Sequence, residues 1–431
     1  MRCVNFWRSS LLMVCKKKEL LVGMLVFGSI LPVTAYADED IVHDSDASVS
    51  LRGAYWSATR RQDSVTDIGA ASIWLGINTQ IGSRQSGRIN AWARSDNIVA
   101  RETDAELREA YWRYTSGFWD LRIGRQLIIW GKADGVNPTD NLAVRNFRLL
   151  TTEDMEQKSG VVTVFASAYI GELRTQLLWL PEFRPHTLPF SETATQKYSE
   201  ISPKDPKKQW AARVERTGGD WDWSLSYFSG YDKSPDLHLG VSTLSMPTID
   251  LVHPRLHVLG ADAAGTVGRI GWRLEGAYTS TPDVTGVDIF TKNSFAYLVA
   301  GVDRTFLDTL NINFQYVYRY IFRYEDPRSA SPQLVELAKA GALANNQFDR
   351  RQNGATLRLH NRWLNDTLAV ELSFMEWWSH RDYVVKPKMS YAWSDHLKTS
   401  VGADIYRGSR DSFLGKLREL SVGYAELQWS Y

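Results

Sequence analysis

The feature that most constrains this chain is a period-two alternation of apolar and polar residues, repeated from residue 47 to residue 431 and interrupted by turns. Between residues 310 and 320 every second position is apolar or aromatic, and the positions between them include Asn311, Asn313, Gln315 and Arg319. Alternate side chains of a β-strand point to opposite faces, so each such segment has one apolar and one polar face. The pattern predicts an all-β chain.

We predict about 18 strands by this alternation rule. They lie near 47–60, 68–82, 87–99, 105–115, 118–130, 158–169, 171–180, 208–217, 220–230, 254–264, 266–280, 293–305, 308–322, 352–363, 366–378, 383–394, 397–407 and 417–431. Short turns alternate with connections that are mostly longer, and the longest are near 131–157, 181–207, 231–253 and 323–351. Short periplasmic turns and longer outer loops are typical of a transmembrane antiparallel up-and-down β-barrel, which is the fold we predict. Two outer connections, near 100–104 and 379–382, are also short, so 16 strands is the alternative.

The N-terminus predicts export. Lys16, Lys17 and Lys18 form a basic region, residues 20–33 are apolar, and Ala35-Tyr36-Ala37 supplies the small residues of a cleavage site. A membrane anchor is disfavoured because the apolar run is short and no stop-transfer flank follows. We therefore expect a signal peptide over 1–37, a periplasmic segment over 38–46 and an outer-membrane barrel over 47–431.

Composition agrees with a barrel and names no partner. The predicted signal removes five of the 50 basic and one of the 49 acidic residues, so the mature chain has 45 and 48. Both cysteines, Cys3 and Cys15, lie in that signal, which leaves no disulfide and no thiolate metal site. The mean hydropathy of −0.31 is that of a soluble protein, but a membrane barrel is apolar on one face only. We expect no cofactor, no metal and no nucleic-acid partner.

The aromatic residues and the C-terminus point to a membrane setting. The chain has 17 Trp and 19 Tyr, and several lie near predicted strand ends, where they would form aromatic girdles at the membrane surfaces: Trp56, Trp179, Trp363, Trp378, Trp393 and Trp429. The last residues place Leu427, Trp429 and Tyr431 at alternate positions. This ending resembles the signature that the barrel assembly machinery recognises; a final amphipathic strand is the simpler interpretation. The expected partners are outer-membrane lipids, that machinery and periplasmic transport proteins.

If the apolar stripe faces lipid, the opposite residues line the lumen. The basic residues assigned to the lumen are Arg52, Arg88, Arg94, Arg108, Arg122, Arg213, Arg269, Arg273, Arg319, Arg358, Arg362, Lys386, Lys388 and Lys398. The acidic ones are fewer: Asp96, Glu106, Glu215, Glu275, Glu371 and Asp404. A basic lumen would favour passage of anions. Bracing of the wall by ion pairs is the alternative, and an unseen β-bulge would change the facing of some positions.

The third outer connection is the candidate constriction. Gly124-Arg125-Gln126 leads to Trp130-Gly131, and Asn137-Pro138-Thr139-Asp140 then fixes a tight turn in a loop that spans 131–157. Loops of this length inside a compact fold are often functional. We expect it to fold into the barrel and narrow the pore, with Trp130, Asn137, Pro138 and Asp140 as its candidate residues. A loop exposed on the cell surface is the alternative.

The same segment carries a resemblance. Leu107-Arg108-Glu109-Ala110-Tyr111, Gly124-Arg125-Gln126, Trp130-Gly131 and Asn137-Pro138-Thr139-Asp140 resemble a large family of proteobacterial outer-membrane barrels of unassigned function, and more weakly the alginate-export porins. The similar part covers about 107–158, roughly an eighth of the chain. Lys132 stands where the family more often has Glu. The resemblance implies a transport barrel. Members of the first family are placed beside systems that transport lipids or hydrophobic compounds across the envelope. The similarity to the alginate-export porins implies an arginine-rich lumen.

Three functions remain to be compared. The first is a porin-like channel for polar, anionic solutes or an exported compound, because barrels of 16 to 18 strands leave an aqueous lumen. The second is a conduit dedicated to a hydrophobic, lipid-like or polysaccharide compound, working with periplasmic or inner-membrane partners. The third, an outer-membrane enzyme, is disfavoured because the eight histidines have no ligand spacing and no GxSxG motif is present. His253 and His257 are four apart, but Pro254 argues against a helical metal face.

Overall fold

The computed structural model describes residues 43–58, 66–96, 102–188, 197–240, 248–409 and 412–431. The predicted signal peptide 1–37 and residues 38–42 of the predicted periplasmic segment lie outside the described residues, as do parts of the predicted loops 181–207 and 231–253. The unit from Asp44 to Tyr431 contains the barrel. No helix in the described ranges is long and apolar enough to cross a membrane.

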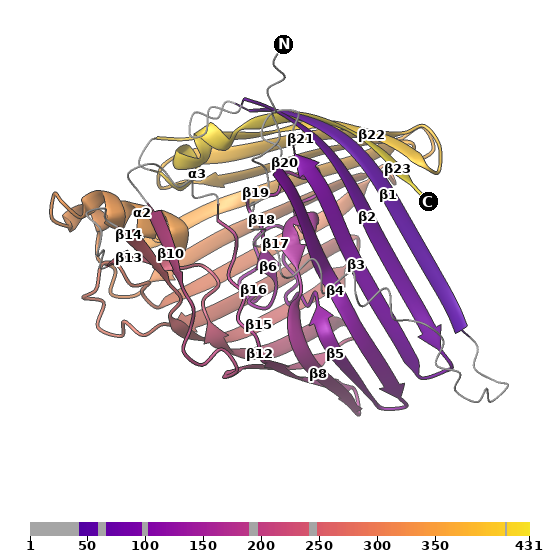
Figure 1. Ribbon diagram of the computed structural model, residues 1–431, viewed down its shortest axis with the longest axis horizontal. Helices are drawn as coiled ribbons and strands as arrows, with labels where there is room; N and C mark the ends of the chain where they lie inside the picture. The colour runs from indigo at the N-terminus through magenta and orange to yellow at the C-terminus, as the bar shows by residue number, and fades with distance from the viewer. Residues whose placement is uncertain (1–42, 59–65, 97–101, 189–196, 241–247, 410–411) are drawn as a thin grey trace, which may run out of the picture. The chain divides into compact units, whose positions relative to one another are not determined.

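Eighteen antiparallel strands form the barrel wall (Figure 1). In chain order they are β1 (His43–Ala58), β2 (Asp67–Ile81), β3 (Gln85–Asp96), β4 (Glu102–Ser116), β5 (Trp119–Gln126), β8 (Val161–Ile170), β9 (Leu173–Leu180), β11 (Gln209–Arg216), β12 (Trp221–Tyr231), β15 (Arg255–Val267), β16 (Ile270–Ser280), β17 (Phe295–Phe306), β18 (Leu310–Ile321), β19 (Arg351–Trp363), β20 (Leu368–Trp377), β21 (Asp382–Ala392), β22 (Leu397–Arg407) and β23 (Val422–Ser430). Each pairs with its neighbour in the chain. The first and last strands pair from Ser50↔Ser430 to Ala58↔Val422 and close the barrel. The prediction of an 18-stranded antiparallel barrel is confirmed.

The two faces of the wall follow the alternation of the sequence. On β18, Phe314 is exposed on the outside, whereas Asn313, Gln315 and Arg319 are buried on the inside. The exposed outer face is apolar over many strands, for example at Leu259, Leu274, Leu298, Leu372 and Leu427. An apolar band of this kind is what a bilayer solvates.

The long connections carry the remaining elements, which gather at one end of the barrel in Figure 1. A three-stranded sheet consists of β10 (Lys197–Ile201), β14 (Thr248–Val252) and β13 (Asp236–Gly240). Near it lies α2 (Val335–Asn345), which contacts β13, and the same connection holds η2 (Pro327–Ser329). Before β23 the chain forms α3 (Phe413–Lys416) and η3 (Leu417–Leu420).

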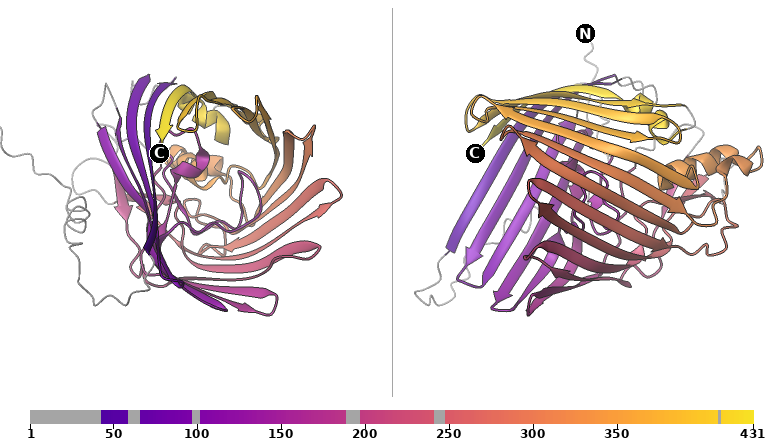
Figure 2. Two further views of the ribbon diagram at one scale, coloured as in Figure 1. Left: turned by 90° about the vertical axis from the view of Figure 1, so that its right-hand side faces the viewer. Right: turned by 180° about the vertical axis from the view of Figure 1, so that it is seen from behind.

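The connection between β5 and β8, residues 127–160, is different because it contacts residues that face the barrel interior. It contains β6 (Val144–Arg145), η1 (Asp154–Gln157) and β7 (Lys158–Ser159), and β6 pairs with β7. In the left view of Figure 2, purple to magenta chain, the colour of these residues, runs inside the ring of strands. We call residues 127–160 the inserted loop.

Candidate functional site: the lumen and the inserted loop

The inserted loop begins with an apolar contact to the wall. Trp130, Leu142 and Val144 are buried in one cluster with inward-facing residues of β8, β9, β11, β12, β15 and β16, including Phe165 and Leu178. The indole Nε1 of Trp130 donates to Gln176 Oε1 at 3.2 Å. This part of the lumen is therefore filled by side chains.

The next part of the loop is seated on β16 and β18. Glu275 accepts hydrogen bonds from the backbone N–H groups of Lys132, Ala133 and Thr139. The carboxylate of Asp134, the residue after Ala133, accepts hydrogen bonds from Arg273 Nη1 at 2.7 Å and from Asn313 Nδ2 at 2.8 Å.

The far end of the loop is seated on other strands of the wall. Arg52 on β1 donates to both carboxylate oxygens of Glu156 at 2.8 and 2.9 Å. Lys388 on β21 pairs with Glu153, and its neighbour Lys386 pairs with Asp154 at 2.9 Å. The loop thus has one seat on β16 and β18 and another on β1 and β21.

Beside these two seats the wall of β19 and β20 presents charge to water. Arg358 on β19 donates to Glu371 on β20 at 2.6 Å, and the Arg358 side chain is 49% exposed although it faces inward, as its register opposite Asn313 shows. Asp134 and Glu153 of the inserted loop are among the charges that act on it. The Arg358 guanidinium is therefore exposed to solvent inside the barrel, and Asp134 lies on Asn313, its neighbour in register. We call this solvent-exposed part of the lumen beside the inserted loop the passage.

Most of the predicted lumen residues face inward. Arg88, Arg94, Arg108, Arg122, Arg273, Arg319, Arg358, Arg362, Lys386 and Lys388 lie on the inner phase of their strands. The assignment of Arg269 to the lumen is corrected, because Arg269 is exposed in the turn between β15 and β16, where Gly268 adopts a φ of +61°. The sequence around this turn has no apolar contrast that would have fixed its position.

Two of these arginines face inward but are covered by the loops. Arg94 is buried and donates to the backbone carbonyl of Leu150 in the inserted loop. Arg319 is buried too, donates to the carbonyl of Asn346 and stacks over the Phe295 ring at 3.9 Å. They brace the loops and do not present charge to a solute.

The predicted constriction residues all belong to the inserted loop. Trp130 and Pro138 are buried, and Asn137 Oδ1 lies beside Gly131 and accepts from Thr139 Oγ1 at 3.4 Å. Asp140 pairs with Lys158 at 2.6 Å across the base of the loop. That they narrow a pore remains a proposal.

Sequence analysis missed several inward-facing carboxylates. They are Glu109, Asp120, Asp262, Asp303 and Glu426. Asn90 is opposite Glu109 and Ala91 is opposite Leu107, so Arg108 forms a bulge on β4 that reverses the phase of the strand and turns Glu109 inward. Asp262 lies among Ala and Gly residues, where alternation gives no signal. Glu109, Asp120, Asp262 and Asp303 pair with inward arginines, and Glu426 adds a fifth inward acid, so the excess of basic over acidic residues predicted for the lumen is too large.

One position predicted at a membrane surface also faces inward. Trp56 is 2% exposed and packs against Tyr424, with ring centroids 4.7 Å apart. Leu150 of the inserted loop packs on the same cluster. Trp56 therefore supports the loop instead of contacting lipid.

Outside the barrel, buried polar residues tie the outer loops to the inserted loop. Lys233 Nζ donates to the carbonyl of Asn141 at 2.6 Å, and burial lowers the pKa of this lysine to about 8. Burial also lowers the pKa of His186 to about 3, so its Nδ1 is free to accept from Arg145 N at 3.0 Å. Within the described ranges no group of three or more His, Cys, Asp or Glu residues is arranged to hold a metal ion.

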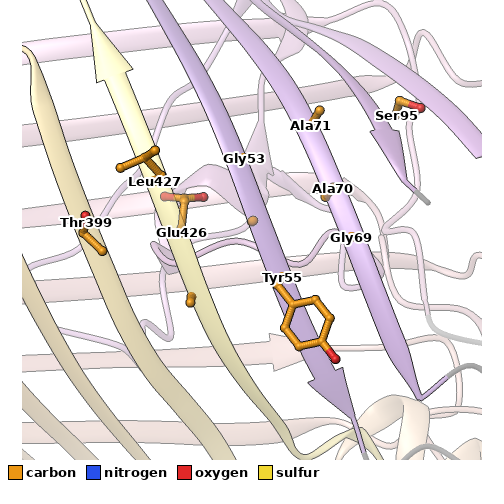
Figure 3. Close-up of a pocket in the computed structure, with 11 residues that line it drawn as sticks. Gly53, Tyr55, Gly69, Ala70, Ala71, Ser95, Thr399, Glu426 and Leu427 are labelled. Atoms are coloured by element: carbon orange, nitrogen blue, oxygen red, sulfur yellow. The ribbon is translucent and has the colours of Figure 1, made fainter. Parts of the chain in front are cut away.

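A hollow of about 680 Å³ lies on the outer surface of the wall across β23, β1 and β2 (Figure 3). Small residues such as Gly53, Ala71 and Ala425 form it, and the exposed Tyr55 and Leu427 lie on the same outer face. It faces away from the lumen and is not part of the passage.

Comparison with known proteins supports the fold. No family model and no curated protein matches the sequence. Among solved structures, the chain is similar to Pseudomonas aeruginosa OpdK with vanillate (TM-score 0.57, 10% identity, 90% of this chain and 98% of that one). It is also similar to Pseudomonas aeruginosa OccK2 (OpdF) in complex with glucuronate (0.54, 10%, 90% and 97%) and to Acinetobacter baumannii OccAB3 (0.56, 8%, 90% and 99%). The barrel therefore has the fold of the Occ/Opd outer-membrane porins.

Proposed function

We propose that this chain is a solute-selective channel of the outer membrane that passes small polar molecules carrying a carboxylate. The observation that carries the proposal is the half-exposed Arg358 inside the barrel, beside the inserted loop whose Asp134 is bound to the neighbouring Asn313. A lumen narrowed by a loop and lined by fixed charge selects solutes by size and by charge.

Exposure within the wall ion pairs favours an anionic group on the solute. In the pair of Arg358 and Glu371 the guanidinium is 49% exposed and the carboxylate 24%. Arg88 and Arg113 are likewise much more exposed than their partners Glu109 and Asp120. In these three pairs the cation is the more exposed partner, whereas in the pairs Arg94–Asp96, Arg273–Asp303 and Lys386–Asp404 the acid is more exposed. The three exposed guanidiniums attract a passing carboxylate.

The exposed loop carboxylates beside the passage add a second preference. Asp134 and Glu153 have their charges paired with Arg273 and Lys388, and they can accept hydrogen bonds from hydroxyl or ammonium groups of a solute. A solute with a carboxylate at one end and donors at the other satisfies both sides. OpdK and OccK2, which share this fold, were crystallised with vanillate and glucuronate, two solutes of this kind.

A dedicated conduit for a hydrophobic or lipid-like compound is the second candidate. The apolar hollow at Gly53 and Ala71 lies on the lipid side of the wall and would support it. The passage itself is lined by charge, which favours a polar solute.

The setting that we propose is the outer membrane of a Gram-negative bacterium, reached through the predicted signal peptide and the barrel assembly machinery. The exposed outward positions of Leu427, Trp429 and Tyr431 on and after β23 suit recognition of the final strand. We propose transport without catalysis, since the inward charges form ion pairs and loop seats and the fold is that of porins.

Liposome swelling tests the proposed selectivity. Vesicles that contain the protein should admit glucuronate faster than glucose, which has the same ring and no carboxylate. Arg358→Gln should reduce this preference, because it removes the half-exposed cation of the passage. Arg216→Gln, which removes an arginine paired with Glu172 at a strand end, is the matched control and should leave the preference unchanged. Equal uptake of both sugars by the unaltered protein would refute the proposal.

A further inference from the structure

Glu275 is a buried carboxylate whose contacts are unlike those of the other inward acids. It lies on β16 and is 1% exposed. Its neighbour in register, Asp262 on β15, pairs with Arg213, but among the ion pairs of the described residues none involves Glu275. A buried carboxylate without a cation needs other donors.

All the hydrogen bonds that the structure gives Glu275 come from the inserted loop. Its Oε2 accepts from the N–H groups of Lys132 and Ala133, each at 2.9 Å. Its Oε1 accepts from Thr139 N at 2.8 Å and from Thr139 Oγ1 at 2.9 Å. The loop from 131 to 139 thus wraps around one carboxylate, with two donors for each oxygen.

The backbone of the loop is shaped for this contact. Gly131 has a φ of +100°, and a Cβ at that position would lie 2.5 and 2.6 Å from the two Glu275 oxygens. A side chain there would push the carboxylate out of its place. The close approach therefore depends on glycine.

The residue that follows this cradle contributes to the passage. Asp134 comes directly after Ala133, and its carboxylate is bound to Arg273 and to Asn313, the neighbour of Arg358 in register. Glu275 thus holds the two residues that precede Asp134 beside the passage.

We propose that Glu275 is a positioning residue that sets the width of the passage by holding segment 131–139 of the inserted loop against β16. The proposal rests on the proposed function, because it assigns a task within the channel. Glu275 does not touch the solute. Its carboxylate acts only through the loop that it seats.

Removal of the carboxylate should release the segment. Glu275→Ala leaves three backbone N–H groups without an acceptor and Thr139 Oγ1 with only its 3.4 Å contact to Asn137, at a cost of about 1–3 kcal/mol for each buried group that stays unsatisfied. The segment can avoid that cost by moving into the lumen water. The atoms that the substitution removes correspond to one acetate ion, so added acetate can fill the vacated seat and bring the segment back.

Single-channel recording in planar bilayers tests this. In potassium chloride, Glu275→Ala should raise the conductance by about twofold relative to the unaltered protein. Millimolar acetate should return it toward the unaltered value, while acetamide, which has the shape but lacks the charge, should not. The unaltered protein should respond to neither additive.

Two further variants make the result decisive. Asp262→Ala removes a buried inward carboxylate opposite Glu275 that contacts wall residues, Ser224 and Arg213, and should leave the conductance unchanged. Thr139→Val removes one hydrogen-bond donor from the loop and leaves the wall unchanged, so it should raise the conductance by less than Glu275→Ala does. This variant keeps the proposal testable if Glu275→Ala fails to fold. Unaltered conductance in both Glu275→Ala and Thr139→Val, or an increase in Asp262→Ala equal to theirs without acetate rescue, would overturn the proposal. Absence of channels in the unaltered protein would instead refute the proposed function.

Discussion

At the scale of single residues, the inserted loop depends on two glycines that differ in their surroundings. Gly131 has a φ of +100° and lies against Glu275, whereas Gly135 has a φ of +74° with no atom near the position of a Cβ. Both have left-handed backbones, but only Gly131 combines this with a close contact. Comparison of Gly131 with Gly135 therefore separates the effect of backbone strain from the effect of crowding by Glu275.

Alanine at these two positions should have unequal effects. Gly135→Ala should cost only the strain of a left-handed alanine, about 1–2 kcal/mol. Gly131→Ala should cost more and also displace the loop, because its Cβ would collide with the Glu275 carboxylate. Thermal unfolding in detergent and single-channel conductance measure the two effects. A conductance change in Gly135→Ala as large as in Gly131→Ala would contradict the argument.

Asp236 gives the outer loops a pH dependence. It is buried on β13 and accepts from Lys292 N at 3.1 Å and Asn345 Nδ2 at 2.7 Å, and burial raises its pKa from 3.8 to about 7. A carboxyl whose pKa is raised on folding contributes stability that is complete below pH 3.8 and is lost as the pH rises to about 7. The contacts between β13 and α2 should therefore weaken over this range.

Hydrogen exchange of residues 236–240 and 335–345 at several pH values measures this weakening, after correction for the intrinsic pH dependence of exchange. Asp236→Asn keeps the acceptor oxygen and cannot ionise, so protection in this variant should be flat between pH 4 and 7. Equal pH dependence in the variant and the unaltered chain would show that another group is responsible.

Residue facing was predictable where apolar and polar residues contrast, and not elsewhere. Phe314 and Asn313 were assigned correctly because their neighbours alternate in the same way. Glu109 was missed because the bulge at Arg108 on β4 leaves no mark in the sequence, and Asp262 because its neighbours are Ala and Gly. The charge balance of the lumen depends on these residues, so sequence alone overstated its basic character.

At the scale of elements, the inserted loop joins strands that are distant in the sequence. Its first part is held by Glu275 and Asn313, and its last part by Arg52 and Lys388. The length of the loop and its Asn137-Pro138 turn predicted that it folds into the barrel, but they did not predict these partners. Glu275, Arg52 and Lys388 each lie more than a hundred residues from the loop residue that they bind. Such contacts follow from barrel closure and have no local signal.

Deletion of residues 137–150 should widen the passage. It removes Thr139 from Glu275 and Leu142 and Val144 from the apolar cluster on the wall. Single-channel conductance should rise, while the strands, which pair independently of the loop, should still form the barrel. Deletion of 284–288, part of an exposed connection between β16 and β17, is the control. Unchanged conductance after deletion of 137–150 would refute a narrowing role.

At the scale of the whole molecule, closure of 18 strands creates the lumen and the inserted loop occupies part of it. The strand count and the alternation of turns and loops were predictable because each strand repeats one local pattern. The position of the loop inside the barrel was predictable only as a hypothesis, because it depends on which side of the wall a loop takes. The outer hollow at Gly53 shows that the wall also has an apolar feature on its lipid side.

The most direct test of the channel is the current through the purified full-length protein in a planar bilayer with a potassium chloride gradient. We expect discrete openings with a reversal potential that favours chloride, interrupted when glucuronate is added. The exposed guanidiniums of Arg88, Arg113 and Arg358 are the physical reason. Preference for potassium, or absence of any openings, would contradict the account.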